Sequence, residues 1–309
     1  MSENITQLMK RGVVLGDGGY LLELERRGYA NTGSGREKGK QFTPEVAIEH
    51  PEALRQLHEE FILAGSQVLQ ALTFFGSREK LTRAGYGAQT ESINSAAVKI
   101  AREAAAGKAL VAGTVSRTQL FEREGPSAGD HVRDLFTEQI RILKDAGSDF
   151  LILETFFRVD EMLIALECAR ESGLPIIATM SFRPSVTNTA DHHSIGECAK
   201  ILVGEGAESV GANCEQEPAR MLPILRAMRE AVAVPIAAQP SAFRTTDATP
   251  CFCLLPQFPD DMETVQISRK DFFDFGAQAK KEGIGFLGGC CGCNAAYIRA
   301  MAQGLASAN

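Results

Sequence analysis

The sequence has 309 residues, of which 44% are hydrophobic and 23% are charged, and its formal net charge is −7 at pH 7. The negative charge argues against a nucleic-acid or anionic-membrane partner, and the chain shows neither a signal-peptide pattern nor an apolar run of the roughly 20 residues that a membrane span needs. We therefore expect an enzyme-sized cytoplasmic protein, with no nucleic-acid or membrane partner, whose eight cysteines are reduced.

Short apolar segments typical of β-strands alternate with helical patterns along the chain. In chain order, the predicted strands lie near 12–15, 67–73, 109–113, 149–154, 175–181, 208–213, 234–238 and 284–288. The predicted helices lie near 44–64, 90–106, 131–146, 159–171, 194–205, 218–231, 269–282 and 294–305. Eight strand–helix units predict an α/β fold with parallel strands, closed into a (β/α)8 TIM barrel that forms one domain over residues 1–309.

The predicted loops differ in length between the two ends of the strands. Helix-to-strand links are short and contain glycine, whereas the strand-to-helix links 114–130, 182–193 and 239–268 are long. In such barrels the loops that follow the strands build the active site. We expect the third long loop, which contains four prolines, to fold over the barrel mouth as a lid or rim.

Polar and thiol side chains stand where several predicted strands end. They are Asp17 after the first strand, Glu154 on the fourth, Cys214 after the sixth, and Cys290 and Cys291 after the eighth. Because parallel strands of a barrel end at one rim, these side chains should converge. Adjacent cysteines flanked by glycines can both face one soft metal ion, and Cys214 would add a third thiolate. Three thiolates with one open position predict a catalytic zinc (Zn2+) site better than a structural one.

Each of these residues can also be interpreted as having only a structural role. The adjacent cysteines can be a pair of small buried side chains, and Asp17 can be only a turn residue. The cysteines at 168 and 198 fall in helical patterns and are expected in the core. Cys251 and Cys253 have no assigned role, whereas Cys293 is expected to be structural because a fourth permanent ligand would close the metal site. The histidines at 50, 58 and 131 are expected at helix surfaces or caps.

A zinc–thiolate site with an open position favours one kind of chemistry. A thiol that enters the open position loses its proton to become a thiolate, which is a nucleophile at neutral pH. The simplest electrophile for it is an activated methyl group. The residues alone therefore predict methyl transfer to sulfur.

At these residues the sequence resembles the homocysteine S-methyltransferase family, and most closely its betaine-using members. The resemblance runs nearly end to end, and its most specific motifs are Gly16-Asp17-Gly18-Gly19, Gly211-Ala212-Asn213-Cys214 and Gly288-Gly289-Cys290-Cys291-Gly292. It implies a zinc-bearing barrel in which the three cysteines hold the metal and homocysteine is methylated to methionine. It also implies that Asp17 and Glu154 hold the ammonium group of homocysteine, and that Gly18 and Asn213 belong to the substrate-binding set.

The methyl-donor side departs from the betaine-using members. They offer a tryptophan and a tyrosine, which hold a trimethylammonium group by cation–π contacts, whereas this chain has no tryptophan and presents Phe42 and Phe75 at these places. Strand alternation would send Phe74 and Phe75 to opposite faces, so Phe75 is the expected contact. We expect an onium donor, with betaine, S-methylmethionine and dimethylsulfoniopropionate as candidates. Arg183 is a candidate partner for a donor carboxylate, and His192 and His193 are expected to face the mouth.

Two other hypotheses are kept. In the first, the methyl group comes from a folate or corrinoid carrier, for which the chain has no added module. In the second, the barrel is not catalytic and its zinc site is structural. The betaine-using members carry a C-terminal extension involved in assembly that this chain lacks, so a homo-oligomer is allowed but its size is not assigned.

Overall fold

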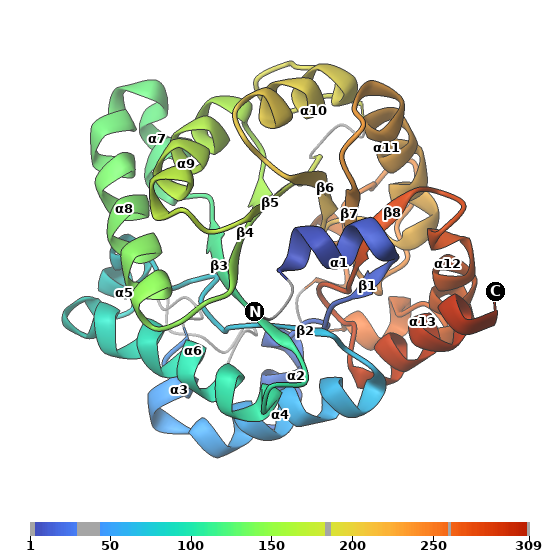
Figure 1. Cartoon of the computed structure of the whole chain (residues 1–309), viewed down its shortest axis with the longest axis horizontal. Helices are drawn as coiled ribbons and strands as arrows, with labels where there is room; N and C mark the ends of the chain where they lie inside the picture. Colours follow the sequence, from blue (N-terminus) through green and yellow to red (C-terminus); the bar gives the residue numbers. More distant parts are fainter. Residues whose placement is uncertain (1–3, 30–43, 183–186, 259–260, 308–309) are drawn as a thin grey trace.

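One sheet of eight parallel strands forms the centre of the computed structural model, which describes residues 4–29, 44–182, 187–258 and 261–307. Along the sheet the order is β1-β8-β7-β6-β5-β4-β3-β2. The strands are β1 (Val14–Leu15), β2 (Val68–Gln70), β3 (Leu110–Ser116), β4 (Phe150–Phe156), β5 (Ile176–Met180), β6 (Ser209–Asn213), β7 (Ile236–Gln239) and β8 (Ile284–Leu287). The predicted TIM barrel is confirmed, with every strand close to its predicted place (Figure 1).

The ring is joined between β1 and β2 by a side chain as well as by the backbone. Gln67 N donates to Leu15 O at 2.7 Å, and Leu15 N donates to Gln67 Oε1 at 3.1 Å. The Ser66 hydroxyl adds a bond to Gly16 O at 3.0 Å. The side-chain oxygen of Gln67 thus supplies to Leu15 N the acceptor that a backbone carbonyl supplies in a regular parallel ladder.

Helices surround the sheet, and all eight predicted ones are present (Figure 1). They are α4 (Pro51–Ala64), α6 (Thr90–Ala105), α8 (Gly129–Asp145), α9 (Val159–Ser172), α10 (Ile195–Gly204), α11 (Pro218–Ala231), α12 (Arg269–Ala279) and α13 (Ala295–Ser307). The predicted helix at 44–64 is broken at His50, which separates α3 (Val46–Glu49) from α4, because a residue that precedes proline avoids the helical conformation. None of the helices in the described ranges is long and apolar enough to cross a membrane.

Several short helices were not predicted. They are α1 (Ile5–Arg11), α2 (Leu21–Arg26), α5 (Arg78–Arg83), α7 (Gln119–Glu124), and the 3₁₀ turns η1 (Gly87–Gln89), η2 (Gly125–Ala128), η3 (Phe252–Leu254) and η4 (Met262–Val265). With two turns or fewer, such helices show little apolar periodicity, and tertiary contacts stabilise them. The clearest sequence indication of α1 is a capping box between Asn4 and Gln7.

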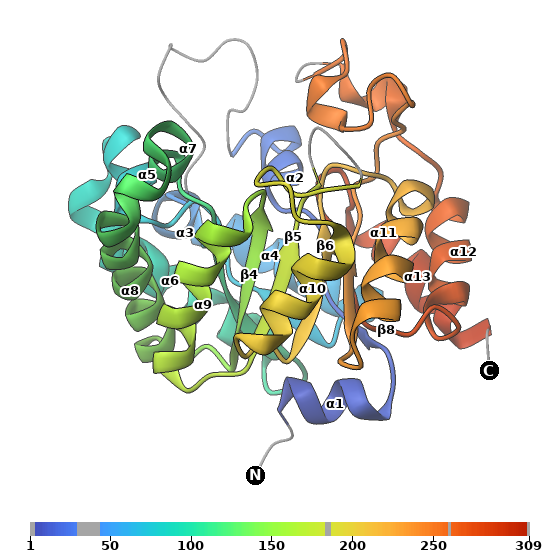
Figure 2. The same ribbon diagram turned by 90° about the horizontal axis from the view of Figure 1, so that it is seen from above.

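Two hydrophobic clusters account for most of the core. Inside the barrel, alternate strand residues such as Phe150, Ile177 and Phe286 pack together, and Ile5 and Met9 of α1 close this cluster from below. Helix α1 accordingly lies across the N-terminal end of the strands (Figure 2). The second and larger cluster fills the space between the strands and the surrounding helices. Helix α1 therefore covers the barrel interior at the N-terminal end of the strands.

The loop after β7 rises above the C-terminal ends of the strands (Figure 2). Its residues Phe243, Phe252, Leu255 and Met262 form a third apolar cluster together with Cys214. Phe252 also lines the cavity at the barrel mouth. The expectation that this loop forms a rim is confirmed.

Gly211 of β6 lies directly against the backbone of β7. A Cβ atom at this position would lie 1.8 Å from Ala237 O, and only a shift of one strand could relieve the clash. We expect Gly211→Ala to lower the free energy of unfolding by about 3 kcal/mol or more, as measured by urea denaturation. Gly204→Ala at the end of α10 is the control, because nothing lies within 4 Å of a Cβ there. Equal urea midpoints for the two variants would refute the argument.

Candidate metal and substrate site

Three thiols converge at the barrel mouth. Their sulfur atoms all lie within 4.8 Å of one another, with Cys214 Sγ 3.7 Å and Cys290 Sγ 4.0 Å from Cys291 Sγ. Zinc–sulfur bonds of about 2.3 Å in a tetrahedral site place two sulfurs about 3.8 Å apart, so the donor set and its spacing fit zinc. A hydrogen bond to Cys290 together with burial raises the pKa of Cys214 well above its usual range. Three thiolates at these distances repel one another, and a bound cation would stabilise them.

The backbone around these thiols is held in unusual conformations. Cys214 and Glu215 have φ values of 61° and 57°, in the left-handed region that residues other than glycine rarely adopt. Cys214 N donates to Gln239 O at 2.8 Å, which ties the end of β6 to the end of β7. Such backbone strain is typical of functional sites.

Gly18 and Gly19 let the loop after β1 pack on the loop after β8. A Cβ at Gly18 would lie 2.0 Å from Cys293 O, and one at Gly19 would lie 2.5 Å from Cys290 O. Both glycines also line the cavity at the mouth. The close packing of the two loops therefore requires glycine at both positions, independently of any contact between Gly18 and a ligand.

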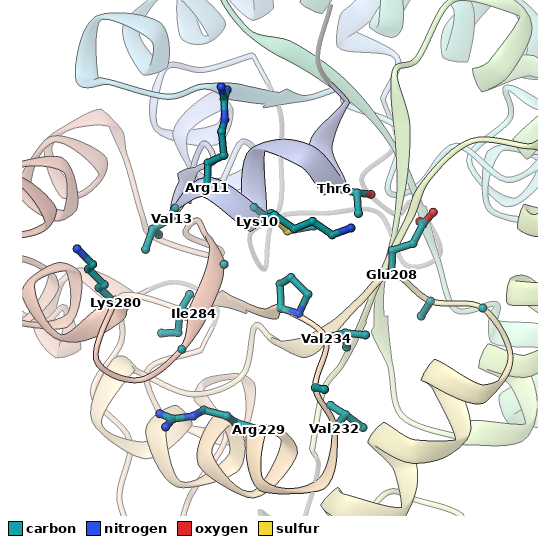
Figure 3. A pocket seen from close by; sticks show the side chains of 18 residues that line it. Thr6, Lys10, Arg11, Val13, Glu208, Arg229, Val232, Val234, Lys280 and Ile284 are labelled. Atoms are coloured by element: carbon teal, nitrogen blue, oxygen red, sulfur yellow. The ribbon is translucent and has the colours of Figure 1, made fainter.

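A cavity of about 310 Å³ joins the three thiols to the other predicted residues. Gly18, Phe75 and Glu154 line it, whereas Asp17 and Asn213 lie behind its surface. A larger hollow of about 950 Å³ lies at the opposite end of the strands (Figure 3), next to residues that precede strands, such as Glu208 and Val234. Barrel enzymes use the C-terminal end, so the cavity with the thiols is the candidate site.

Asp17 is fully buried within a hydrogen-bonded chain. Its Oδ2 accepts a bond from the Tyr20 hydroxyl and another, at 2.6 Å, from Gln70 N. The Tyr20 hydroxyl also lies 2.8 Å from His58 Nδ1. Burial raises the pKa of Asp17 to about 7 and lowers the pKa of His58 to about 3. Within the described part of the chain, Asp17 Oδ1 is buried without a hydrogen-bond partner, so the protein does not fully satisfy this carboxyl group.

Glu154 reaches the cavity surface through a second set of polar contacts. Its Oε1 accepts from Gln70 Nε2 at 3.2 Å, and its Oε2 accepts from Asn213 Nδ2 at 3.4 Å. Gln239 Nε2 donates in turn to Gln70 Oε1 at 2.5 Å. Burial, reinforced by the nearby charge of Asp17, raises the pKa of Glu154 to about 8. Two carboxyl groups that both accept hydrogen bonds from Gln70 favour a cationic ligand.

A bulge in β4 directs Glu154 toward the cavity. The pairing with β5 shifts register between Leu153 and Phe156, and Thr155 adopts a φ of 62°. Asn213 holds this conformation: its Oδ1 accepts from Thr155 N at 2.8 Å, and its Nδ2 donates to Thr155 Oγ1 at 2.6 Å. The observed contacts of Asn213 therefore position its neighbours.

Removing the Asn213 amide should destabilise the bulge. Asn213→Ala leaves Thr155 N–H buried without its acceptor, and we expect the free energy of unfolding to fall by about 2–4 kcal/mol in urea denaturation. Ser209→Ala at the other end of β6 is the matched control, because it removes one hydrogen bond, to Pro235 O at 2.9 Å. The control should cost about 1 kcal/mol. A smaller loss for Asn213→Ala than for Ser209→Ala would contradict this role.

The aromatic residues after β2 differ from the prediction. Both Phe74 and Phe75 line the cavity, so the expectation that only one of them faces it was wrong. The reason is that β2 ends at Gln70, and strand alternation does not extend to the turn that follows. The two rings lie 4.7 Å apart at 62°, and Lys80 Nζ lies 5.2 and 5.4 Å from their centroids. Phe42 and Arg183 lie outside the described residues.

Of the other five cysteines, only Cys253 is among the described residues that line the cavity. Cys293 is buried and donates to Pro240 O at 3.3 Å, outside the cluster of three thiols, and the cysteines at 168 and 198 are buried in the core. Cys251 is buried, whereas Cys253 lines the cavity and donates to Glu215 Oε2 at 3.1 Å. His192 and His193 are not among the described residues that line the cavity. His58 was wrongly expected at a helix surface or cap.

Sequence reasoning missed several polar residues of the site. Gln70 and Gln239 end strands β2 and β7, so the rule that polar residues at strand ends meet at one rim could have found them. His58 lies on α4 and Tyr20 is the N-cap residue of α2, and nothing local distinguishes them. Arg117 follows β3 directly and lines the cavity.

Comparisons with known proteins agree with this geometry. The family model described as homocysteine S-methyltransferase matches residues 14–305. Betaine–homocysteine S-methyltransferase 1 of Bos taurus is 39% identical over 307 residues, which cover 95% of this chain and 72% of that protein. An S-methylmethionine–homocysteine S-methyltransferase of Pongo abelii is 37% identical over 303 residues, covering 95% and 78% of the two chains.

Solved structures show the same fold. The oxidized form of the homocysteine methyltransferase MmuM from Escherichia coli aligns with a TM-score of 0.75 at 19% identity, covering 97% of this chain and 99% of that one. Its metallated form aligns with a TM-score of 0.72 at 20% identity, covering 94% and 95%.

Proposed function

The chain belongs to the homocysteine S-methyltransferase family, and we propose that it transfers a methyl group from an onium donor to the thiol of homocysteine with the help of zinc. The product is methionine. The observation that carries the proposal is the cluster of Cys214, Cys290 and Cys291 on the wall of a cavity that also contains a buried carboxyl group. A structural zinc site would not need to open onto such a cavity.

Cys214, Cys290 and Cys291 would hold the zinc ion. When bound, zinc supplies Lewis-acid chemistry that favours the thiolate form of an incoming thiol. The three cysteines would leave one position open toward the cavity, and Cys293 stays outside the ligand set because its thiol is engaged by Pro240 O.

Glu154 and Asp17 would hold the ammonium group of homocysteine. Glu154 would contact the ligand from the cavity wall, and Asp17 would add its charge from behind that wall. Asn213 and the Gly18 loop position these groups. An ammonium ion between two carboxyl groups favours their ionised forms, which burial opposes in the free protein.

The donor would enter above homocysteine, against the aromatic residues. Phe75, with Phe74 beside it, offers ring faces for an onium group, and Phe42 is the second aromatic residue that the sequence proposes for this pocket. The relatives named above use betaine and S-methylmethionine, which share an onium methyl group. That shared chemistry, rather than one compound, is proposed for this chain.

A donor screen tests the function. Zinc-loaded protein is incubated with homocysteine and glycine betaine, S-methylmethionine or dimethylsulfoniopropionate, and methionine is measured by mass spectrometry. Loss of activity after chelation, with circular dichroism unchanged, supports catalysis, whereas loss of the fold supports a purely structural metal. Activity with a methylated folate or corrinoid alone would favour the alternative carriers.

The cysteines also bear on the compartment in which the protein works. All eight are free thiols in the structure, and several lie close together. Thiols persist in a reducing environment, which supports our proposal of a cytoplasmic enzyme.

A further inference from the structure

Arg117 is the only lysine or arginine among the described residues that line the cavity at the barrel mouth. The other ionisable groups on that wall are Glu154, Glu215, Tyr20 and thiols. We infer that Arg117 binds the carboxylate of the methyl donor, so that the site selects onium donors that also carry a carboxylate. This inference rests on the proposed function and names its donor class.

The charges around the cavity suit a donor with two opposite charges. Acidic groups gather at the inner end, where Glu154 lines the wall and Asp17 lies behind it. The ammonium group of homocysteine balances one of these two carboxyl charges, so an onium group is still attracted toward this end and a carboxylate is repelled from it. Arg117 supplies the positive group that a carboxylate needs on the same wall.

Arg117 lies nearer to the mouth than the residues proposed for homocysteine. Ser116, the last residue of β3, pairs with Glu154 in the sheet, and Arg117 follows it by one further step of about 3.3 Å. Its guanidinium carbon lies 4.2 Å from the ring centroid of Phe157, which is three residues beyond Glu154. Arg117 is therefore at the height of a second substrate that enters above the amino acid.

Arg117 directly follows a residue that is bonded to the turn carrying the aromatic pair, and it lines the same cavity as both rings. The Ser116 hydroxyl donates to Phe74 O at 2.5 Å, which joins the end of β3 to the turn that carries Phe74 and Phe75. An onium group against these rings and a carboxylate on Arg117 can thus belong to one small molecule. Arg183, which the sequence suggested for this role, lies outside the described residues.

The guanidinium can exchange its present partner for a ligand. Arg117 Nη1 forms an ion pair with Glu122 Oε1 of α7, and the two side chains are 23% and 37% exposed. Arg117 Nη1 itself is buried, but the Glu122 side chain is 37% exposed and can turn into water when a ligand carboxylate takes its place. Stacking on Phe157 holds the planar guanidinium group of Arg117 in place, so that two of its N–H groups can bind one carboxylate.

The test compares donors with and without a carboxylate. Methionine formation is measured with glycine betaine or dimethylsulfoniopropionate, and with trimethylsulfonium, which has an onium group but no carboxylate. For Arg117→Gln we expect the KM for the first two to rise roughly 10- to 100-fold, while the values for trimethylsulfonium and for homocysteine stay within about threefold. Arg117→Lys should raise the KM for the first two donors less than Arg117→Gln does, because lysine keeps the positive charge but cannot form the two parallel hydrogen bonds of a guanidinium group.

Two further variants sharpen the test. Glu122→Gln removes the competing carboxylate, so we expect the KM for glycine betaine to fall. Arg123→Gln is the matched control for Arg117→Gln. Arg123 is next to Glu122 on α7, but it forms an ion pair with Glu79 and is not among the described residues that line the cavity. The KM values of Arg123→Gln for all substrates should stay within about twofold of those of the wild type.

Other outcomes would overturn the inference. An equal rise in KM for trimethylsulfonium would mean that Arg117 only shapes the pocket, and a rise confined to homocysteine would assign Arg117 to the acceptor. A binding readout separates this inference from the proposed function: 3,3-dimethylbutanoate, which has no transferable methyl group, is titrated by calorimetry into zinc-loaded protein with homocysteine. Binding that Arg117→Gln abolishes supports the carboxylate site even if no donor yields methionine, and no binding to the wild type refutes it.

Discussion

Cys214→Ala is expected to purify without zinc and to form methionine at a rate reduced by more than ~100-fold. Two thiolates remain in this variant, and losing a direct ligand should cost more than the ~10- to 100-fold typical for residues that merely support one. Zinc content by inductively coupled plasma mass spectrometry and initial rates at saturating homocysteine and glycine betaine measure both effects. Because the thiol lies at the rim and not in the barrel interior, circular dichroism should be unchanged.

Cys293→Ala is the control for this experiment. Cys293 is two residues from Cys291 and equally a thiol, but it bonds Pro240 O and lies outside the cluster. This variant should keep one zinc ion per chain and most of its activity. If Cys293→Ala lost zinc while Cys214→Ala kept it, the assignment of the ligands would be wrong.

Glu154→Gln is expected to raise the KM for homocysteine by roughly 30-fold or more, with zinc content unchanged. The substitution keeps the shape of the side chain and removes the charge that would pair with a buried ammonium group, a loss worth about 2 kcal/mol or more. Glu161→Gln is the matched control. Glu161 is also buried, and a glutamine oxygen can still accept the bonds from Thr118 N and Oγ1, at 2.6 and 2.8 Å. The control should not change the KM for homocysteine.

The same carboxyl groups predict how binding depends on pH. The pKa values of Asp17 and Glu154 are raised to about 7 and about 8, so both groups are largely protonated at pH 6 in the free protein. Binding of an ammonium group needs the ionised forms. The KM for homocysteine should therefore rise as the pH falls from about 8 to 6, by up to ~10-fold per pH unit for each group that must lose a proton. In Glu154→Gln the part of this rise near pH 8 should disappear.

The sequence alone was sufficient to predict the architecture. Strand and helix periodicities are local properties, and in a barrel the position of a strand along the chain determines its neighbours. The same rule predicted that Cys214 and Cys290, 76 positions apart in the numbering, would approach each other. Short elements such as α1 were missed because their stability comes from contacts such as Met9 on the barrel interior.

The tertiary structure decided which of the side chains at the rim reach the cavity. Glu154 does so because a bulge at Thr155, held by Asn213, directs it there, whereas Asp17 is held behind the wall by Tyr20 and Gln70. A strand end determines the height of a residue in the barrel but not the direction of its side chain, which depends on hydrogen bonds between residues far apart in the chain. The sequence therefore predicted that the three cysteines would meet at the rim, but it could not show that the side chain of Arg117 reaches the cavity wall.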